Sequence, residues 1–409
     1  MAMAERGAGE RDLESQVPRW AAAFARRTRA DVGAGLAEIL AQSGATDVIS
    51  FSGGFPDSAT FPGPVLADLL HGILSSGDPS AMQYGPTPGL PGPRDYIASR
   101  IELQHGARPA ESELLVTSGA VECLELVGKS LLDPGDLVLV EGPTYLGAIM
   151  AFRSFEADVR AVPMDARGLE VDAVEAAVRG RSPKLLYSIP DHQNPAGVSL
   201  AAERRQALVE LARHRGFLVV EDVAYRELGF DATGSPSLWS LGPDVVVQAG
   251  TFSKTFFPGV RLGWALGPIA VVDRLTRAKQ LTDQCASPLA QRLLEEYGRS
   301  GHLDRQIAGA RDLYGKRSAL MLEALERHMP DGASWTRPRG GFFTWLTLPE
   351  GAGSVDVTRL GMERGVAVVP GVPFYPDRRG RKNVRLSFSR VADNEIEEGV
   401  RRLASVLSS

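Results

Sequence analysis

Short apolar runs alternate with longer amphipathic stretches between about residues 113 and 248. The runs are rich in Val, Leu and Ile without regular polar alternation, which is typical of strands buried on both faces of a parallel sheet. They are Glu113–Thr117, Leu137–Glu141, Lys184–Ile189, Leu218–Glu221 and Val245–Gln248. The helical candidates between them are 120–132, 144–155, 170–178 and 201–215. This alternation predicts an α/β domain with a mainly parallel central sheet covered by helices.

The regions that flank this alternation have other patterns. Asp31–Ser43 has apolar residues at helical spacing, which predicts a short amphipathic helix. Ser50–Pro64 and Gln83–Pro93 are so rich in Gly and Pro that we expect loops there. A long charged stretch over 290–327 has helical spacing, and the segments after it predict a smaller α+β unit.

A chain of 409 residues is too long for a single hydrophobic core, so more than one domain is expected. We predict that residues 1–50 form an N-terminal segment belonging to a small domain. Residues 51–300 would form the large domain, and residues 301–409 the C-terminal part of the small one.

Composition narrows the class of protein. The hydrophobic fraction of 44% and charged fraction of 23% are those of an ordinary globular protein. A net charge of −5 gives no support for a nucleic-acid or membrane partner. No apolar run is long enough to span a bilayer, and the N-terminus lacks the pattern of a secretory signal. Two cysteines and scattered histidines predict neither disulfides nor a metal site, so we expect a cytoplasmic enzyme.

Lys254 is the first candidate for chemistry, because it directly follows a predicted strand in the segment Gly250–Lys254. A lysine that forms a Schiff base needs burial and nearby positive charge to lower its pKa. Ser253 and the nearby Arg261 are donors of the kind that bind a phosphate. Taken alone, Lys254 fits a solvated surface residue better, because lone lysines are usually solvated.

Three further segments also follow predicted strands. Glu221–Tyr225 places an acid and a tyrosine where open α/β sheets bind ligands, although Asp222 could equally cap a helix. Ile189–Gly197 contains Asn194 in a sequence that is also an ordinary turn signature. Thr117–Ala120 joins a strand to a helix through small residues, which leaves free N–H groups for an anion.

Together these segments have the order and spacing of one family. From about residue 48 to its end, the chain resembles fold-type I pyridoxal-phosphate (PLP) enzymes of the class I/II aminotransferase family, in the branch with 2-aminoadipate, kynurenine and aromatic aminotransferases. The resemblance rests on Ser52–Asp57, Gln83–Gly85, Val140–Tyr145, Gln193–Pro195, Glu221–Asp222, Gly250–Lys254 and Val384–Ser389. It implies the fold of that family, a large PLP-binding domain with a smaller α+β domain.

The resemblance also implies roles for individual residues. Lys254 would hold PLP and act as the base at Cα, with Asp222 on the ring nitrogen and Tyr225 on the 3-oxygen. The other cofactor-binding residues would be Tyr84, Ser118, Gly119, Ala120, Tyr145, Asn194, Ser253 and Arg261. Arg385 would bind the substrate α-carboxylate, which would also lie near Gly54 and Asn194. Tyr84 would reach the phosphate of a second subunit, so a homodimer with shared active sites is implied.

The implied reaction is transamination between an α-amino acid and a 2-oxo acid, through a quinonoid and the aminated cofactor PMP. The amino acid would carry a long, acidic or aromatic side chain. Departures from the family pattern at Ala120–Glu122 and at Asp191–His192 leave an alternative open. Asp191 and His192 would then have a specialised role beside the cofactor, in β- or γ-replacement, carbon–carbon bond-forming cyclisation or oxidation. A transcriptional regulator built on this fold is disfavoured, because no helix-turn-helix pattern precedes the domain.

Overall fold

The computed structural model describes residues 20, 22–29, 47–231 and 234–407. The helix expected over Asp31–Ser43 lies outside these residues. Within the described part of the chain, no helix is both long enough and apolar enough to cross a membrane.

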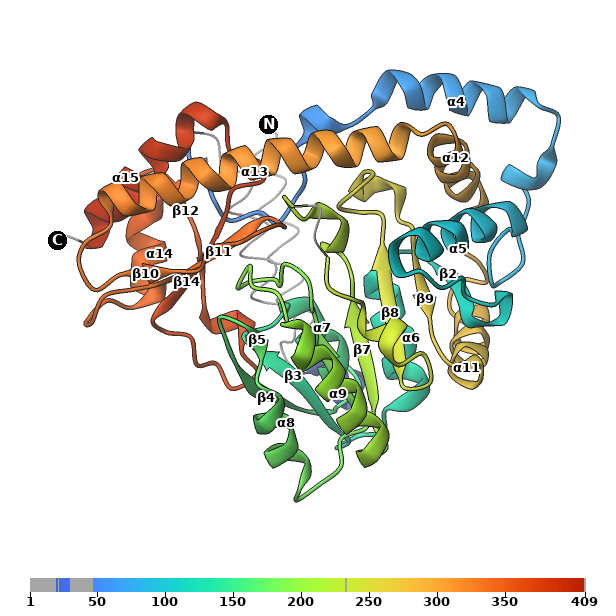
Figure 1. Cartoon of the computed structure of the whole chain (residues 1–409), viewed down its shortest axis with the longest axis horizontal. Helices are drawn as coiled ribbons and strands as arrows, with labels where there is room; N and C mark the ends of the chain where they lie inside the picture. The colour runs from blue at the N-terminus through green and yellow to red at the C-terminus, as the bar shows by residue number, and fades with distance from the viewer. Residues whose placement is uncertain (1–19, 21, 30–46, 232–233, 408–409) are drawn as a thin grey trace.

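An eight-stranded sheet forms the centre of the larger part of the molecule (Figure 1). Its strands, in spatial order, are β2 (Leu114–Thr117), β9 (Gly263–Leu266), β8 (Val246–Thr251), β7 (Leu218–Asp222), β6 (Leu185–Ser188), β3 (Leu137–Gly142), β4 (Asp158–Asp165) and β5 (Gly168–Leu169). The block from β8 to β4 is parallel, whereas β9 runs antiparallel to both of its neighbours. The α/β fold class and the five predicted strands are confirmed, while β4, β5 and β9 were not predicted.

Alternate residues of these strands are buried on opposite faces of the sheet. In β3, Val138 and Val140 belong to one apolar cluster with helix α6 (Ala120–Leu131) and helix α7 (Leu146–Arg153). Leu137 and Leu139 belong to a second cluster with α8 (Val171–Val178), α9 (Ala202–Arg215) and α10 (Leu238–Leu241). Burial on both faces is why the strands lack polar alternation.

Four further helices lie towards the edge of the sheet or across its end: α4 (Gly63–Ser75), α5 (Pro91–His105), α11 (Ile269–Gln280) and α12 (Pro288–Arg299). The stretch over 290–327 is helical, as expected, and contains two helices, since α13 (His302–His328) is separated from α12. Gly301 lies between them with a φ of 71°, a left-handed conformation that stops the helix. The loop expected over Gln83–Pro93 ends earlier, because α5 begins at Pro91.

The smaller part of the molecule contains a four-stranded antiparallel sheet with the order β10 (Ser334–Trp335), β11 (Phe343–Thr347), β14 (Asn383–Ser387) and β13 (Val369–Pro370). Helices α14 (Ser354–Glu363) and α15 (Ile396–Leu407) pack beside it, and the short helix α2 (Arg26–Arg29) lies near the N-terminus. Strand β1 (Ile49–Ser50) pairs in parallel with β12 (Val366–Ala367), which joins an early segment to the C-terminal part. Long α13 runs across both parts (Figure 1). The proposed division near residues 50 and 300 stays a prediction.

Candidate active site

A cavity of about 270 Å³ lies at the carboxyl ends of the parallel strands. Such edges gather residues that are distant in sequence, because parallel strands end on the same side. The cavity brings together most of the residues singled out in the sequence: Gly54, Ala120, Tyr145, Asn194, Asp222, Tyr225, Ser253, Lys254, Arg261 and Arg385. Gly119 and Ser118 immediately precede Ala120 at the same corner.

Lys254 follows β8, and its Nζ donates a hydrogen bond to the Gly54 carbonyl at 2.9 Å. Burial lowers the pKa of Lys254 to about 8, and the positive charges of Arg385 and Arg261 act in the same direction. A far larger share of this amine than of an ordinary lysine is therefore unprotonated near neutral pH. That is the state a lysine needs to attack an aldehyde.

Asp222 ends strand β7 and is 5% exposed. Its carboxylate accepts hydrogen bonds from the Tyr187 hydroxyl at 2.7 Å and from the Ala224 N–H at 3.0 Å. Burial raises the pKa of Asp222, whereas these two donors and the charge of Lys254 oppose the rise. Tyr187 is a site residue that the sequence interpretation missed. The available signal was a tyrosine in the buried run Leu185–Ser188, where a hydroxyl requires a partner.

Arg385 lies in β14 of the smaller sheet and is 4% exposed. Its guanidinium donates to Asn194 Oδ1 at 3.0 Å and to the Ser52 carbonyl at 2.6 Å, and it lies over the Phe343 ring. No carboxylate of the described residues forms an ion pair with it, and its Nε is buried without a hydrogen-bond partner. Burial lowers the pKa of Arg385 to about 10. A buried guanidinium in this condition fits the carboxylate of an incoming ligand.

The other end of the cavity is built for an anion. Gly119 caps the N-terminus of α6 with a φ of 102°, and a Cβ there would lie 2.8 Å from Arg261 Nη2. Arg261 donates to Ser253 Oγ at 3.2 Å and to the Ser118 carbonyl at 3.0 Å. Unpaired N–H groups at a helix start, a hydroxyl and a guanidinium form a suitable phosphate site. The Ser118 hydroxyl, by contrast, donates to Asp283 at 3.2 Å.

Asn194 and Tyr225 also line the cavity, and both are buried. Burial raises the pKa of Tyr225, while the charge of Arg385 and a hydrogen bond with Asn194 lower it. Glu141 anchors the turn that carries Asn194. Its carboxylate accepts hydrogen bonds from Gln193 Nε2 at 2.9 Å and from Ser188 Oγ at 2.6 Å. Glu141 was also missed, although it stands inside a motif that had been singled out.

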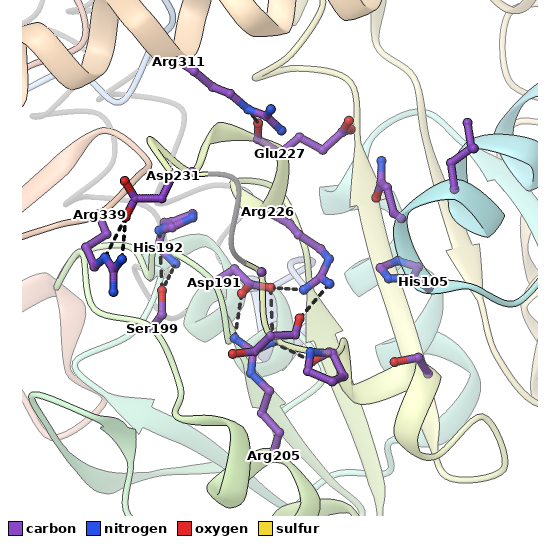
Figure 2. Close-up of a pocket in the computed structure, with 17 residues that line it drawn as sticks. His105, Asp191, His192, Ser199, Arg205, Arg226, Glu227, Asp231, Arg311 and Arg339 are labelled. Atoms are coloured by element: carbon purple, nitrogen blue, oxygen red, sulfur yellow. Dashed lines mark hydrogen bonds and ion pairs between the residues drawn. The ribbon is translucent and has the colours of Figure 1, made fainter.

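Three of the predicted residues lie elsewhere. Tyr84 is 80% exposed and does not line this cavity. Asp191 and His192 line a second cavity of about 700 Å³ (Figure 2), whose lining includes neither Asn194 nor Lys254. There Asp191 forms ion pairs with Arg205 and with Arg226, both at 2.6 Å. The backbone N–H of His192 donates a hydrogen bond to Ser199 Oγ at 3.0 Å. The structure therefore does not bring the Asp191–His192 pair into the cavity of Lys254.

Comparison with known proteins identifies the family to which this chain belongs. Residues 46–403 match the family of class I and II aminotransferases. The chain belongs to that family. It is 36% identical to aromatic-amino-acid aminotransferase 1 of Thermococcus litoralis over 376 residues, which are 90% of each chain.

Two solved aminotransferases show the same fold. A Pyrococcus horikoshii kynurenine aminotransferase in complex with PMP and kynurenine superposes with a TM-score of 0.91 at 35% identity, covering 97% of this chain and 98% of the other. An α-aminoadipate aminotransferase of Thermus thermophilus, complexed with N-(5′-phosphopyridoxyl)-L-leucine, gives 0.87 at 36% identity, with 95% and 98% covered. This chain is accordingly a PLP-dependent aminotransferase, as the sequence predicted, and its cavity has the lysine, acid and anion site that PLP requires.

Proposed function

We propose that the Lys254 cavity binds PLP and carries out transamination, with Lys254, Asp222 and Arg385 in the roles predicted from the sequence. The observation that carries the proposal is the convergence of Lys254, Asp222 and Arg385 on one cavity. Bound PLP supplies an electron-withdrawing ring that acidifies the Cα proton of an amino acid. Asp222 would keep the ring nitrogen protonated, and the amine of Lys254 would be the base that accepts the proton from Cα and delivers it to C4′ of the cofactor.

Arg385 and Asn194 would hold the α-carboxylate, with the Gly54 backbone beside it. A bidentate guanidinium fixes the orientation of the amino acid, which places its Cα proton toward Lys254. Tyr145 would cover the ring of the cofactor, and Tyr225 with Asn194 would hydrogen-bond its 3-oxygen. Gly119, Ala120, Ser253 and Arg261 would surround the phosphate.

The amino-acid substrate that we propose has a long acidic or aromatic side chain, and the co-substrate is a 2-oxo acid. Support comes from the relatives, whose names specify aromatic amino acids, kynurenine and α-aminoadipate. We also propose a homodimer in which Tyr84 donates to the phosphate bound by the other subunit. Support comes from the exposure of Tyr84 and nearby Met82, and from the absence of Tyr84 from the lining of its own cavity. The cytoplasmic location stays a prediction.

The half-reaction tests this function against the alternative chemistries. The holoenzyme is mixed with an amino acid and no 2-oxo acid, and the absorbance of the lysine-bound cofactor is followed. A transaminase stops after one equivalent of 2-oxo acid per site and recovers its absorbance when an acceptor is added. Continued turnover without acceptor would instead favour replacement, cyclisation or oxidation.

A further inference from the structure

Three charged side chains, those of Glu122, Lys279 and Asp283, form a cluster at the corner between strand β2 and helix α6. Glu122, in the first turn of α6, accepts a hydrogen bond from the Ser118 N–H at 2.5 Å. Lys279 of α11 places its Nζ at 2.8 Å from both Glu122 oxygens, and at 2.9 and 2.8 Å from the two oxygens of Asp283. The Lys279 side chain is fully buried, with 0% exposed.

Ser118 is the residue on which this cluster acts. Its N–H is held by Glu122, its hydroxyl donates to Asp283, and its carbonyl accepts from Arg261. A serine hydroxyl has a single hydrogen to donate, so its donation to Asp283 leaves none for a phosphate. Ser118 therefore serves as an anchor for the backbone of Gly119 and Ala120, which the Lys254 cavity adjoins.

With all three groups ionised, the cluster of Glu122, Lys279 and Asp283 carries a net negative charge. One ammonium faces two carboxylates beside a helix N-terminus, which is a place that favours an anionic ligand. Burial raises the pKa of Glu122, and the hydrogen bond and charge of Lys279 oppose that rise. Without the Lys279 charge, Glu122 and Asp283 would compete with, and repel, a phosphate at the same corner.

We propose that Glu122, Lys279 and Asp283 form a positioning cluster that anchors Ser118, and that the Lys279 charge sets the affinity of the corner for the phosphate of the cofactor. This inference rests on the proposed binding of PLP in the Lys254 cavity. None of the three side chains is a catalytic residue, because they act on the cofactor through Ser118 and through their charge.

The test compares a phosphorylated and a non-phosphorylated vitamer. Holoenzymes of wild type, Lys279→Met and the triple variant Glu122→Gln/Lys279→Met/Asp283→Asn are equilibrated by dialysis against graded PLP or pyridoxal. We expect Lys279→Met to weaken PLP about 10- to 100-fold and pyridoxal by less than about threefold. The triple variant, which removes the carboxylate charges as well, should regain most of the PLP affinity. Lys316→Met, which removes an exposed lysine paired with Asp393, is the matched control.

Equal weakening of PLP and pyridoxal by Lys279→Met would overturn the inference, as would a triple variant no better than Lys279→Met. Absence of binding of both vitamers by wild type would instead contradict the proposed function.

If thermal unfolding shows that Lys279→Met does not fold, the PLP affinities of Glu122→Gln and Glu122→Ala test the inference instead. Gln keeps an acceptor for the Ser118 N–H and removes one negative charge, so PLP should bind equally or more tightly. Ala should weaken it, and tenfold weaker binding by the Gln variant would refute the charge argument.

Discussion

Arg385 donates a hydrogen bond from Nη1 to Oδ1 of Asn194 at 3.0 Å, although the two residues are 191 positions apart. The bond joins β14 of the smaller sheet to the turn that follows β6 of the larger sheet. Through it, the side chain proposed to bind the substrate carboxylate is in contact with the side chain proposed to bind the 3-oxygen of PLP. Substrate and cofactor recognition are thereby coupled at one contact.

Arg385→Lys should reduce kcat/KM for the amino acid about 100-fold, mainly through KM. A lysine supplies a point charge without the planar fork that can contact Asn194, Ser52 and a carboxylate together. Steady-state kinetics measure the effect, and the spectrum of the bound cofactor should change little. Arg339→Lys, at an exposed pair with Asp231, is the control and should keep wild-type kinetics. A wild-type KM in Arg385→Lys would remove Arg385 from the substrate site.

Capture of PLP by the cofactor-free enzyme should accelerate with rising pH and level off above a midpoint near 8. The reason is that the pKa of Lys254 is lowered to about 8 and only the unprotonated amine attacks the aldehyde. Below the midpoint the amine is protonated and capture slows. Stopped-flow absorbance measures the rate at each pH. Because the charge of Arg385 helps to lower this pKa, Arg385→Leu should move the midpoint upward. A midpoint near 10.5 in wild type, the ordinary value, would contradict the burial argument.

Tyr187→Phe should lower kcat about 10-fold while leaving PLP bound. The substitution removes the 2.7 Å hydrogen bond that orients the Asp222 carboxylate but keeps the packing of the ring. Asp222 then loses a donor that opposes the rise of its pKa, so its ionised form is less favoured. Activity should therefore recover partly at higher pH, and a pH profile of kcat measures this. An unchanged profile would show that Tyr187 is only a packing residue.

The parts of the site that the sequence predicted are those where a residue follows directly on a buried strand. Lys254 and Asn194 come after β8 and β6, and Asp222 ends β7, so their meeting at one edge is a consequence of parallel topology. Strand β4 was missed because it carries exposed polar residues such as Arg160, and only Val159 and Val162 of the strand are buried. Strand β9 was missed because its pairing partners are set by tertiary structure rather than by its own sequence.

Side-chain direction was beyond what the sequence could predict. Asp191 and Asn194 stand three positions apart in one turn, yet they line different cavities. The direction of Asp191 is decided by Arg205 of α9 and by Arg226, and neither belongs to a motif of the family resemblance. The same holds for Ser118, whose hydroxyl is directed by Asp283. Partners distant in sequence decide which way a side chain points.

Mixing two variants that are each impaired in PLP binding or attachment tests the proposed shared sites. Tyr84→Phe should weaken PLP binding, because the other subunit's phosphate loses a donor, and Lys254→Ala should abolish covalent attachment. In a heterodimer of Lys254→Ala with Tyr84→Phe, the subunit that keeps Lys254 receives Tyr84 from its partner. That site is intact, so mixed dimers should show wild-type PLP affinity at half of their sites. Equilibrium dialysis after subunit exchange measures this, and no gain over Tyr84→Phe alone would place Tyr84 outside the site.

Asp191→Asn should destabilise the protein without changing the chemistry. Burial would raise the pKa of Asp191, but Arg205 and Arg226 outweigh it and hold that pKa down to about 2. An amide in its place leaves the Arg205 charge, on a side chain that is 1% exposed, without a counter-ion. We expect a loss of about 2–4 kcal/mol in the free energy of unfolding, measured by denaturant titration.

The matched control is Asp231→Asn, which breaks an exposed pair with Arg339 and should cost less than about 1 kcal/mol. Because the folded-state pKa of Asp191 is depressed, its contribution is present above the unfolded pKa near 3.8 and is lost as the pH falls toward 2. The difference between wild type and Asp191→Asn should therefore shrink over that acidic window. If Asp191→Asn instead kept its stability and lost turnover, Asp191 would act on the reaction itself. A specialised chemistry for the Asp191–His192 pair would then outweigh the structural role.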